Sequence, residues 1–333
     1  MNTHWLLKTN TQPLARIQRF LIDLYARADL HGLIAPIRPA GTTHVEIRYA
    51  QDAQQLRHVD PFAPVMRCNA AKLAAELAQQ FPCDRLGALL RPCEIRALVE
   101  LDRRDPFDLN RFLIVGVDCV GTFPVEEYAA RASFAGGADA LTREVLQFMR
   151  SGGLGVNRYR VACQMCDTHM PDGVQLSLSV FGLPTRETVL LTVRDIALVE
   201  RLGLLDITDG EAERAEVAQH VQMHAVVNER RQRNRERFMQ ALPPTLPTNA
   251  AELAVHLASR AACQECFKAC PLADGDIPVS SKGDADTLTK INRWLESCVE
   301  CGMCEQACPK HLLLVVEHEH IRQCMLPEPD LAR

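Results

Sequence analysis

The fold is decided by the stretch RLGALLRPCEIRALVELDRRDPFDLNRFLIVGVDC, which runs from Arg85 to Cys119. Its two ends, 85–90 and 111–117, are short apolar runs that predict buried strands, and apolar residues recur at helical spacing between them. A strand, a helix and a second strand in this order predict an α/β unit with parallel strands. Because such strands carry their functional residues at their carboxyl ends, Cys93 and Cys119 fall where a site is expected.

Patterns on both sides extend this unit into a domain. Helical spacing of apolar residues occurs in residues 15–34, 69–81, 139–151 and 193–204. The second of these begins at Asn69, a residue type that caps helix N-termini, and residues 174–182 alternate like a half-exposed strand. We therefore predict that residues 1–210 form an α/β (α+β) N-terminal domain with a mostly parallel sheet.

The sequence changes character after residue 210. Residues 211–242 form a charged helical pattern that contains RRQRNRER, and PPTLPT at 243–248 cannot continue a helix. This change predicts a linker at 211–249, made of a charged helix and a Pro-rich segment, before a second domain at 250–333. We interpret the Arg cluster as a solvated helix face without a function of its own.

Composition argues against several classes of function. The chain has 333 residues, 47% of them apolar, with 37 basic and 42 acidic side chains and a formal charge of −5. This balance favours neither a nucleic-acid nor an anionic-membrane partner. The longest apolar runs fall far short of the roughly 20 residues that span a bilayer, and the N-terminus lacks the pattern of an export signal. We therefore expect a cytoplasmic protein.

The 14 cysteines are the main chemical signal. Because cytoplasmic thiols are kept reduced, metal sites explain so many cysteines better than disulfides do. The strongest motif is Cys298-Val-Glu-Cys301-Gly-Met-Cys304-Glu-Gln-Ala-Cys308-Pro309, which matches the C-x2-C-x2-C-x3-C-P run of bacterial ferredoxins. Upstream, the sequence RAACQECFKACP repeats the run with Cys263, Cys266 and Cys270, but Arg260 stands in the first cysteine position. The pair predicts a small C-terminal bacterial ferredoxin-like dicluster domain.

The two runs divide into two sets of ligands, because the last cysteine of each run serves the other cluster in two-cluster ferredoxins. The first set is complete, with Cys270, Cys298, Cys301 and Cys304. The second set contains Cys263, Cys266 and Cys308. Three outcomes fit this second set: Cys324 joins it, a group other than cysteine completes it, or a three-iron cluster forms. We favour an unusual fourth ligand. A zinc ribbon is the alternative for both sets, although its cysteine pairs are normally farther apart.

Four further cysteines occur in the first domain. Cys93 and Cys119 each follow a predicted strand, and Cys163 and Cys166 form a C-x2-C pair. Thiols at the mouth of an α/β sheet can converge on a cluster. Cys68 and Cys83 lie outside every set, and we interpret them as structural thiols. We interpret His169 as a solvent-facing loop residue, and Trp294 as core packing rather than a shield for a cluster.

Three stretches resemble the beta subunits of coenzyme F420-dependent hydrogenases and formate dehydrogenases. They are LRPCEIRALVELDR at 90–103, FLIVGVDCVGTFPVEEY at 112–128 and CQMCDTHMPDGVQLSLSVFG at 163–182. The resemblance implies that Cys93, Cys119, Cys163 and Cys166 bind a 4Fe–4S cluster, and that the domain binds FAD. The formate dehydrogenase type is similar also in having ferredoxin motifs beside this domain. Arg91 and Arg96 flank Cys93 and are candidates to hold a phosphate or to offset the charge of the cluster.

These observations predict an electron-transfer subunit of a multisubunit oxidoreductase, with two to three 4Fe–4S clusters and, by the resemblance, FAD. The expected partner is a catalytic subunit, most simply of a formate dehydrogenase. A hydrogenase or a heterodisulfide-reductase-like complex is the alternative partner. Two other hypotheses are a zinc-binding scaffold without catalysis and a self-sufficient flavin reductase.

Overall fold

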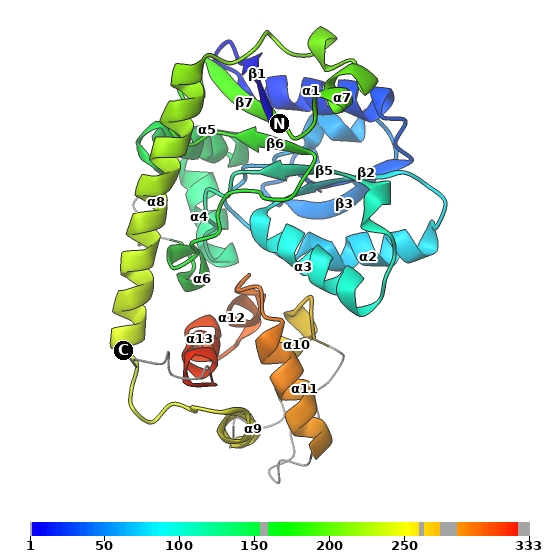
Figure 1. Cartoon of the computed structure of the whole chain (residues 1–333). Coiled ribbons are helices and arrows are strands. Elements are labelled where there is room, and N and C mark those ends of the chain that lie inside the picture. Colours follow the sequence, from blue (N-terminus) through cyan, green and yellow to red (C-terminus); the bar gives the residue numbers. More distant parts are fainter. Residues whose placement is uncertain (1, 154–158, 260–262, 274–284, 326–333) are drawn as a thin grey trace, which may run out of the picture.

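The computed structural model describes residues 2–153, 159–259, 263–273 and 285–325. Arg260 and part of the segment between the two cysteine runs therefore lie outside the described residues. A twisted sheet with helices on both faces forms one part of the molecule, and a group of helices from the C-terminal region packs beside it (Figure 1). A long helix runs along both parts and connects them (Figure 1).

The sheet has seven strands in the order β1-β7-β6-β5-β4-β2-β3. They are β1 (Thr3–Lys8), β2 (Gly32–Ile37), β3 (Glu46–Ala50), β4 (Leu86–Leu90), β5 (Phe112–Val117), β6 (Leu176–Ser179) and β7 (Thr188–Val193). The four central strands, β2, β4, β5 and β6, are parallel to one another, whereas β3 on one side and β7 and β1 on the other extend the sheet by antiparallel pairing. The prediction of parallel strands at 85–90 and 111–117 is confirmed, since β4 and β5 pair in parallel.

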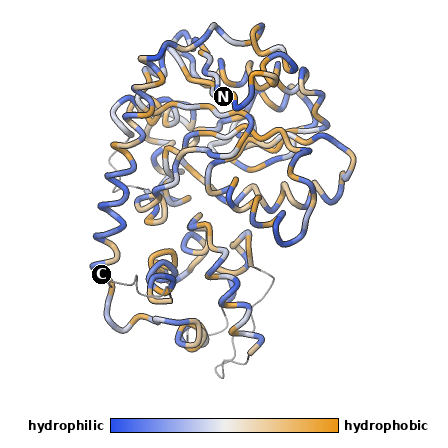
Figure 2. The backbone as a smooth tube through the Cα atoms, in the orientation of Figure 1, coloured by the Kyte–Doolittle hydropathy of each residue, from blue (hydrophilic) through white to orange (hydrophobic). Residues whose placement is uncertain are grey.

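Helices cover both faces of the sheet. In the sheet part they are α1 (Pro13–Arg27), α2 (Ala70–Gln80), α3 (Pro92–Arg104), α4 (Val125–Phe134), α5 (Ala138–Phe148), α6 (Val161–Gln164) and α7 (Ile196–Arg201). Side chains of β5 alternate between the two faces: Leu113 and Val115 pack with α1, α4 and α5, and Phe112 and Ile114 pack with α2 and α3. Figure 2 shows the strands mainly in the hydrophobic colour, as this double burial requires.

The first turns of α2 and α3 are joined by one buried carboxylate. Oε2 of Glu94 accepts a hydrogen bond from the backbone N–H of Arg91 at 2.8 Å, and Oε1 accepts one from Ala70 N–H at 3.2 Å. The predicted cap is also present, because the Asn69 side chain accepts from Ala71 N–H. This capping fixes the start of α3 and with it the position of Cys93.

Several elements differ from the sequence-based expectation. The helix expected over 15–34 ends at Arg27, and residue 32 already begins β2. The apolar pattern of the sequence did not predict strands β1, β2, β3 and β7. Strands β1 and β7 pair with each other at one edge of the sheet, and β2 contains Pro36. Pro36 leaves only the first half of β2 to pair with β4.

The charged helix exists, and its Arg cluster is solvated only in part, since Arg230, Arg233 and Arg237 are exposed but Arg231 is buried. It is α8 (Arg214–Gln240), and Figure 2 shows much of it in the hydrophilic colour. Five of its side chains are nevertheless buried, at positions 220, 224, 227, 231 and 234. These positions are three or four residues apart, so they form one stripe that faces the sheet part. The interpretation of the cluster as solvated is therefore wrong for Arg231, which is 3% exposed.

The C-terminal helices are α9 (Ala250–Ser259), α10 (Glu265–Ala269), α11 (Ala285–Glu296), α12 (Met303–Ala307) and α13 (Leu314–Met325). They share a separate apolar core around Phe267, Ile291, Trp294 and Leu295. A ferredoxin-like fold for this part remains a prediction. Among the described residues no helix combines the length and the apolar character that a membrane span requires.

Candidate metal centres

The four cysteines of the N-terminal part lie around one cavity. Cys93 is in the first turn of α3 and Cys119 follows β5, so the parallel neighbours β4 and β5 bring them together. Cys163 is in the short helix α6, and Cys166 follows that helix. All four side chains line the same enclosed cavity. The sheet edge and one short helix thus assemble the set that the sequence suggested.

Cationic side chains surround this cavity. Arg91, Arg160 and Arg231 line it together with the cysteines. Burial raises the pKa of Cys119 to about 11, against the opposing charges of Arg91 and Arg231. Burial would also raise the pKa of Cys163, but Arg160 and the Thr122 hydroxyl, 3.2 Å from its Sγ, lower it overall. The cavity therefore favours thiolates on the side where Arg160 lies.

The cysteines of the C-terminal part fall into two groups. A charge on Cys270 would raise the pKa of Cys298, Cys301 and Cys304, and burial raises the pKa of all four thiols, to about 12 for Cys298 and about 11 for Cys301. Cys263, Cys266 and Cys308 line a second cavity, which is otherwise mainly apolar. The grouping is the crossed one, in which each run contributes its last cysteine to the other set.

The second group has three cysteines and no fourth thiol. Among the described residues its cavity is completed by Leu257, Phe267, Pro309, Lys310, Leu312 and Leu314, without a carboxylate or an imidazole. Cys324 is exposed, and its Sγ lies 3.8 Å from His320 Nε2 rather than in this cavity. The structure therefore gives no support to Cys324 as the missing ligand. An unusual fourth ligand stays a prediction.

Cys301 connects the two parts of the molecule. It belongs to the group with Cys270, yet its side chain also lines the cavity of the N-terminal cysteines. Arg160 secures this position: its guanidinium donates to the carbonyl of Cys301 at 3.2 Å and to that of Gly302 at 3.1 Å. Its Nε donates to the Thr122 hydroxyl at 2.8 Å. One buried side chain thus holds the C-terminal cysteine loop against the sheet part.

The two arginines that were candidates for a cofactor contact lie in different surroundings. Arg91 is buried, and its Nη2 donates to the carbonyls of Ala63 and Val65. Arg96 donates to the carbonyls of Thr168 and Val299, and it lines an open cavity of about 720 Å³. This cavity also touches Cys298. The geometry gives Arg91 an anchoring role and leaves Arg96 beside a space for a ligand.

Two residues, His169 and Arg231, have a different environment from the one that the sequence suggested, and Trp294 makes one contact beyond its expected core packing. His169 is 1% exposed, so its interpretation as a solvent-facing residue is wrong. Trp294 is buried in the core as expected, but its indole N–H also points to Cys270 Sγ at 3.3 Å. Arg231 donates to the carbonyls of Cys119 and Cys166. A polar stripe at helical spacing on α8 was the only sequence signal for Arg231.

A substitution of Gly302 tests how tightly the loop after Cys301 must pack against α6. It has φ +68°, and a Cβ there would lie 2.5 Å from Ala162 Cβ. We expect Gly302→Ala to lower the free energy of unfolding by about 3 kcal/mol, from left-handed strain of ~1–2 kcal/mol and overpacking of ~1–3 kcal/mol. Gly173→Ala is the matched control, because Gly173 has φ +72° and open space around it. Urea unfolding of the iron-loaded protein measures both. Equal losses in the two variants would show that the contact with Ala162 is unimportant.

The residues fit iron–sulfur clusters. Each group offers three or four thiols that line one cavity or lie close enough to influence one another's pKa, and all of these thiols except Cys263 are buried or half-buried. Arginines near the thiols would offset the negative charge of a cluster, and such charges together with hydrogen bonds to sulfur tune its potential. Cys93, Cys119, Cys163 and Cys166 would hold one cluster, and the two C-terminal groups would hold two more. Cysteine-rich sites of this kind are compatible with an electron-transfer role.

Comparison with known proteins adds little to these observations. No protein-family model matches the chain. One similar solved structure is a chain of the F420-reducing NiFe hydrogenase complex from Methanosarcina barkeri, with 11% sequence identity and a TM-score of 0.49. The match covers 72% of this chain and 92% of that chain. A likeness at this level says nothing about what this chain binds or does.

Proposed function

We propose that this chain is an iron–sulfur electron-transfer subunit of a multisubunit oxidoreductase. The observation that carries the proposal is the position of Cys301, which belongs to one group of cysteines and lines the cavity of another. A 4Fe–4S cluster supplies one-electron transfer when it is bound. Adjacent cysteine groups would hold neighbouring clusters, and electrons can pass along such a row of clusters from one end to the other.

The residues of this chain supply position, charge and exclusion of water. The group of Cys263, Cys266 and Cys308 shares the helix pair α10 and α12 with the group of Cys270 and Cys304. Cys301, which belongs to the group of Cys270 and Cys304, also lines the cavity of the N-terminal cysteines. This arrangement supports a linear order of three sites, with the group containing Cys263 at one end and the group containing Cys93 at the other.

The partner is a catalytic subunit that oxidises or reduces the substrate. The motifs shared with formate dehydrogenase beta subunits make that enzyme the first candidate, and a hydrogenase or heterodisulfide-reductase-like complex is the second. We also propose bound FAD, on the sequence resemblance alone, and flavin analysis of the purified chain tests it. The cavity of about 720 Å³ beside Arg96 and Cys298 has the size of a site for a cofactor or substrate.

Anaerobic purification with iron, sulfide, zinc and flavin analysis tests the proposal. We expect about twelve iron atoms per chain for three 4Fe–4S clusters, or about eleven if the group of three cysteines holds a three-iron cluster. A three-iron cluster would give an EPR signal in the oxidised protein, whereas the other clusters give signals after reduction. Zinc in place of iron in the cysteine sites would overturn the proposal in favour of a scaffold.

A further inference from the structure

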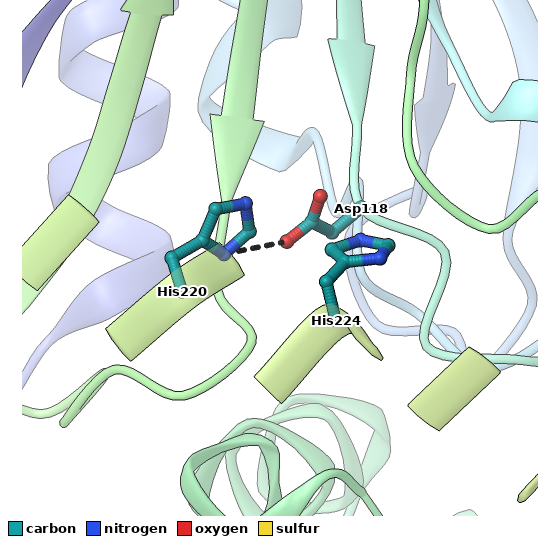
Figure 3. Close-up of side chains that lie close together, drawn as sticks. All are labelled: Asp118, His220 and His224. Carbon is teal, nitrogen blue, oxygen red and sulfur yellow. Dashed lines mark ion pairs between the residues drawn. The ribbon is translucent and has the colours of Figure 1, made fainter. Parts of the chain in front are cut away.

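A second cluster of metal-binding side chains lies outside the cysteine sites. Asp118 follows β5 and directly precedes Cys119, and His220 and His224 lie one turn apart on α8 (Figure 3). One carboxylate oxygen and one ring nitrogen from each histidine all lie within 4.8 Å of one another. The three residues are 1%, 5% and 9% exposed, respectively. The cluster thus joins the carboxyl end of β5, where Asp118 lies, to helix α8, which carries the two histidines.

Hydrogen bonds within the protein leave part of this cluster unsatisfied. Oδ2 of Asp118 accepts from the backbone N–H of Val180 at 2.8 Å and of Phe181 at 3.3 Å. Oδ1 of Asp118 and Nε2 of His224 have no hydrogen-bond partner among the described residues, although both atoms are buried. Buried polar atoms without partners cost ~1–3 kcal/mol each, so two of them in one cluster require an explanation.

We propose that Asp118, His220 and His224 bind a divalent transition-metal cation, for which zinc is the natural candidate. Two imidazoles and one carboxylate suit zinc or ferrous iron, whereas calcium and magnesium prefer sites made only of oxygen. Histidines four residues apart on a helix present their rings on the same side, as in known zinc sites. The cation would occupy the space that the two unpartnered atoms border.

The surroundings provide access and a role for this site. His224 also lines the open cavity of about 720 Å³, through which an ion and a water ligand can enter. Nδ1 of His220 lies 3.0 Å from the carbonyl oxygen of Phe181, so that ring is already held in place. A cation here ties α8 to the end of β5. Since Cys119 is the next residue after Asp118, the cation also fixes one wall of the cysteine cavity.

Zinc binding by the iron-loaded chain tests this site. We expect the wild-type protein, stripped with EDTA and dialysed against micromolar zinc, to gain about one zinc per chain without loss of iron. The double variant His220→Gln, His224→Gln is expected to bind zinc at least about tenfold more weakly. His318→Gln is the matched control, because His318 is at least as buried as the two histidines of the site and its ring nitrogens have no hydrogen-bond partner in the part of the chain that the structure describes. This control should bind as much zinc as the wild type.

Two further measurements separate this site from the cysteines and from misfolding. X-ray absorption at the zinc edge should show only nitrogen and oxygen ligands at about 2.0 Å, and sulfur at about 2.3 Å would overturn the proposal. Asp118→Asn keeps the shape of the side chain and should also weaken zinc binding. Equal zinc in the wild type and in the substituted variants would overturn the proposal as well. Iron content, measured on every sample, reports on the cysteine sites independently.

Discussion

The double substitution Cys298→Ala, Cys301→Ala will remove about four of about twelve iron atoms from the chain. Two of the four thiols in the group with Cys270 and Cys304 are then missing, and two thiols cannot hold a 4Fe–4S cluster. The visible absorbance of the iron–sulfur clusters should fall by about one third in parallel. Electron transfer between the two outer sites should become much slower, because the middle site is lost.

Cys68→Ala, Cys83→Ala is the matched control for this experiment. Both of these thiols are exposed, and neither lines a cavity of the cysteine groups. The control should keep all of its iron. Circular dichroism of both variants checks that the helices have formed. Full iron content in the first variant would show that Cys298 and Cys301 are not ligands, and the order of sites proposed above would then be wrong.

Arg160→Met is the substitution from which we expect the largest loss of stability. Arg160 is 6% exposed, and its side chain satisfies the carbonyls of Cys301 and Gly302 and the hydroxyl of Thr122. Methionine fills much of the same volume but leaves these acceptors buried without a donor. Each such group costs ~1–3 kcal/mol, so the free energy of unfolding should fall by about 3 kcal/mol or more.

Two related variants show what Arg160 contributes. Arg160→Lys keeps the charge but cannot make all three hydrogen bonds, so it should recover less than half of the lost stability. Arg233→Met is the surface control: its side chain is 67% exposed, and its ion pair with Glu229 should contribute at most about 0.5 kcal/mol. Urea unfolding of the iron-loaded proteins measures all three. Similar losses for Arg160→Met and Arg233→Met would contradict the bridging role of Arg160.

Much of the sheet part followed from local patterns. The apolar runs 85–90 and 111–117 predicted β4 and β5, and the rule for parallel strands placed Cys93 and Cys119 at the same edge. Asn69 marked the start of α2 through its capping side chain. The edge strands had weaker patterns, because antiparallel pairing and a proline within β2 depend on partners far away in the sequence.

The sequence by itself predicted metal binding by the cysteines, because ligand spacing such as that from Cys298 to Cys308 is local and survives in any fold that keeps the loop intact. Only the tertiary structure decided which sites are neighbours. The contact of Cys301 with the N-terminal cavity joins residues far apart in the chain. Arg231 was expected on a solvated helix face, since a polar residue gives no sign of burial until the partners that satisfy it are brought near.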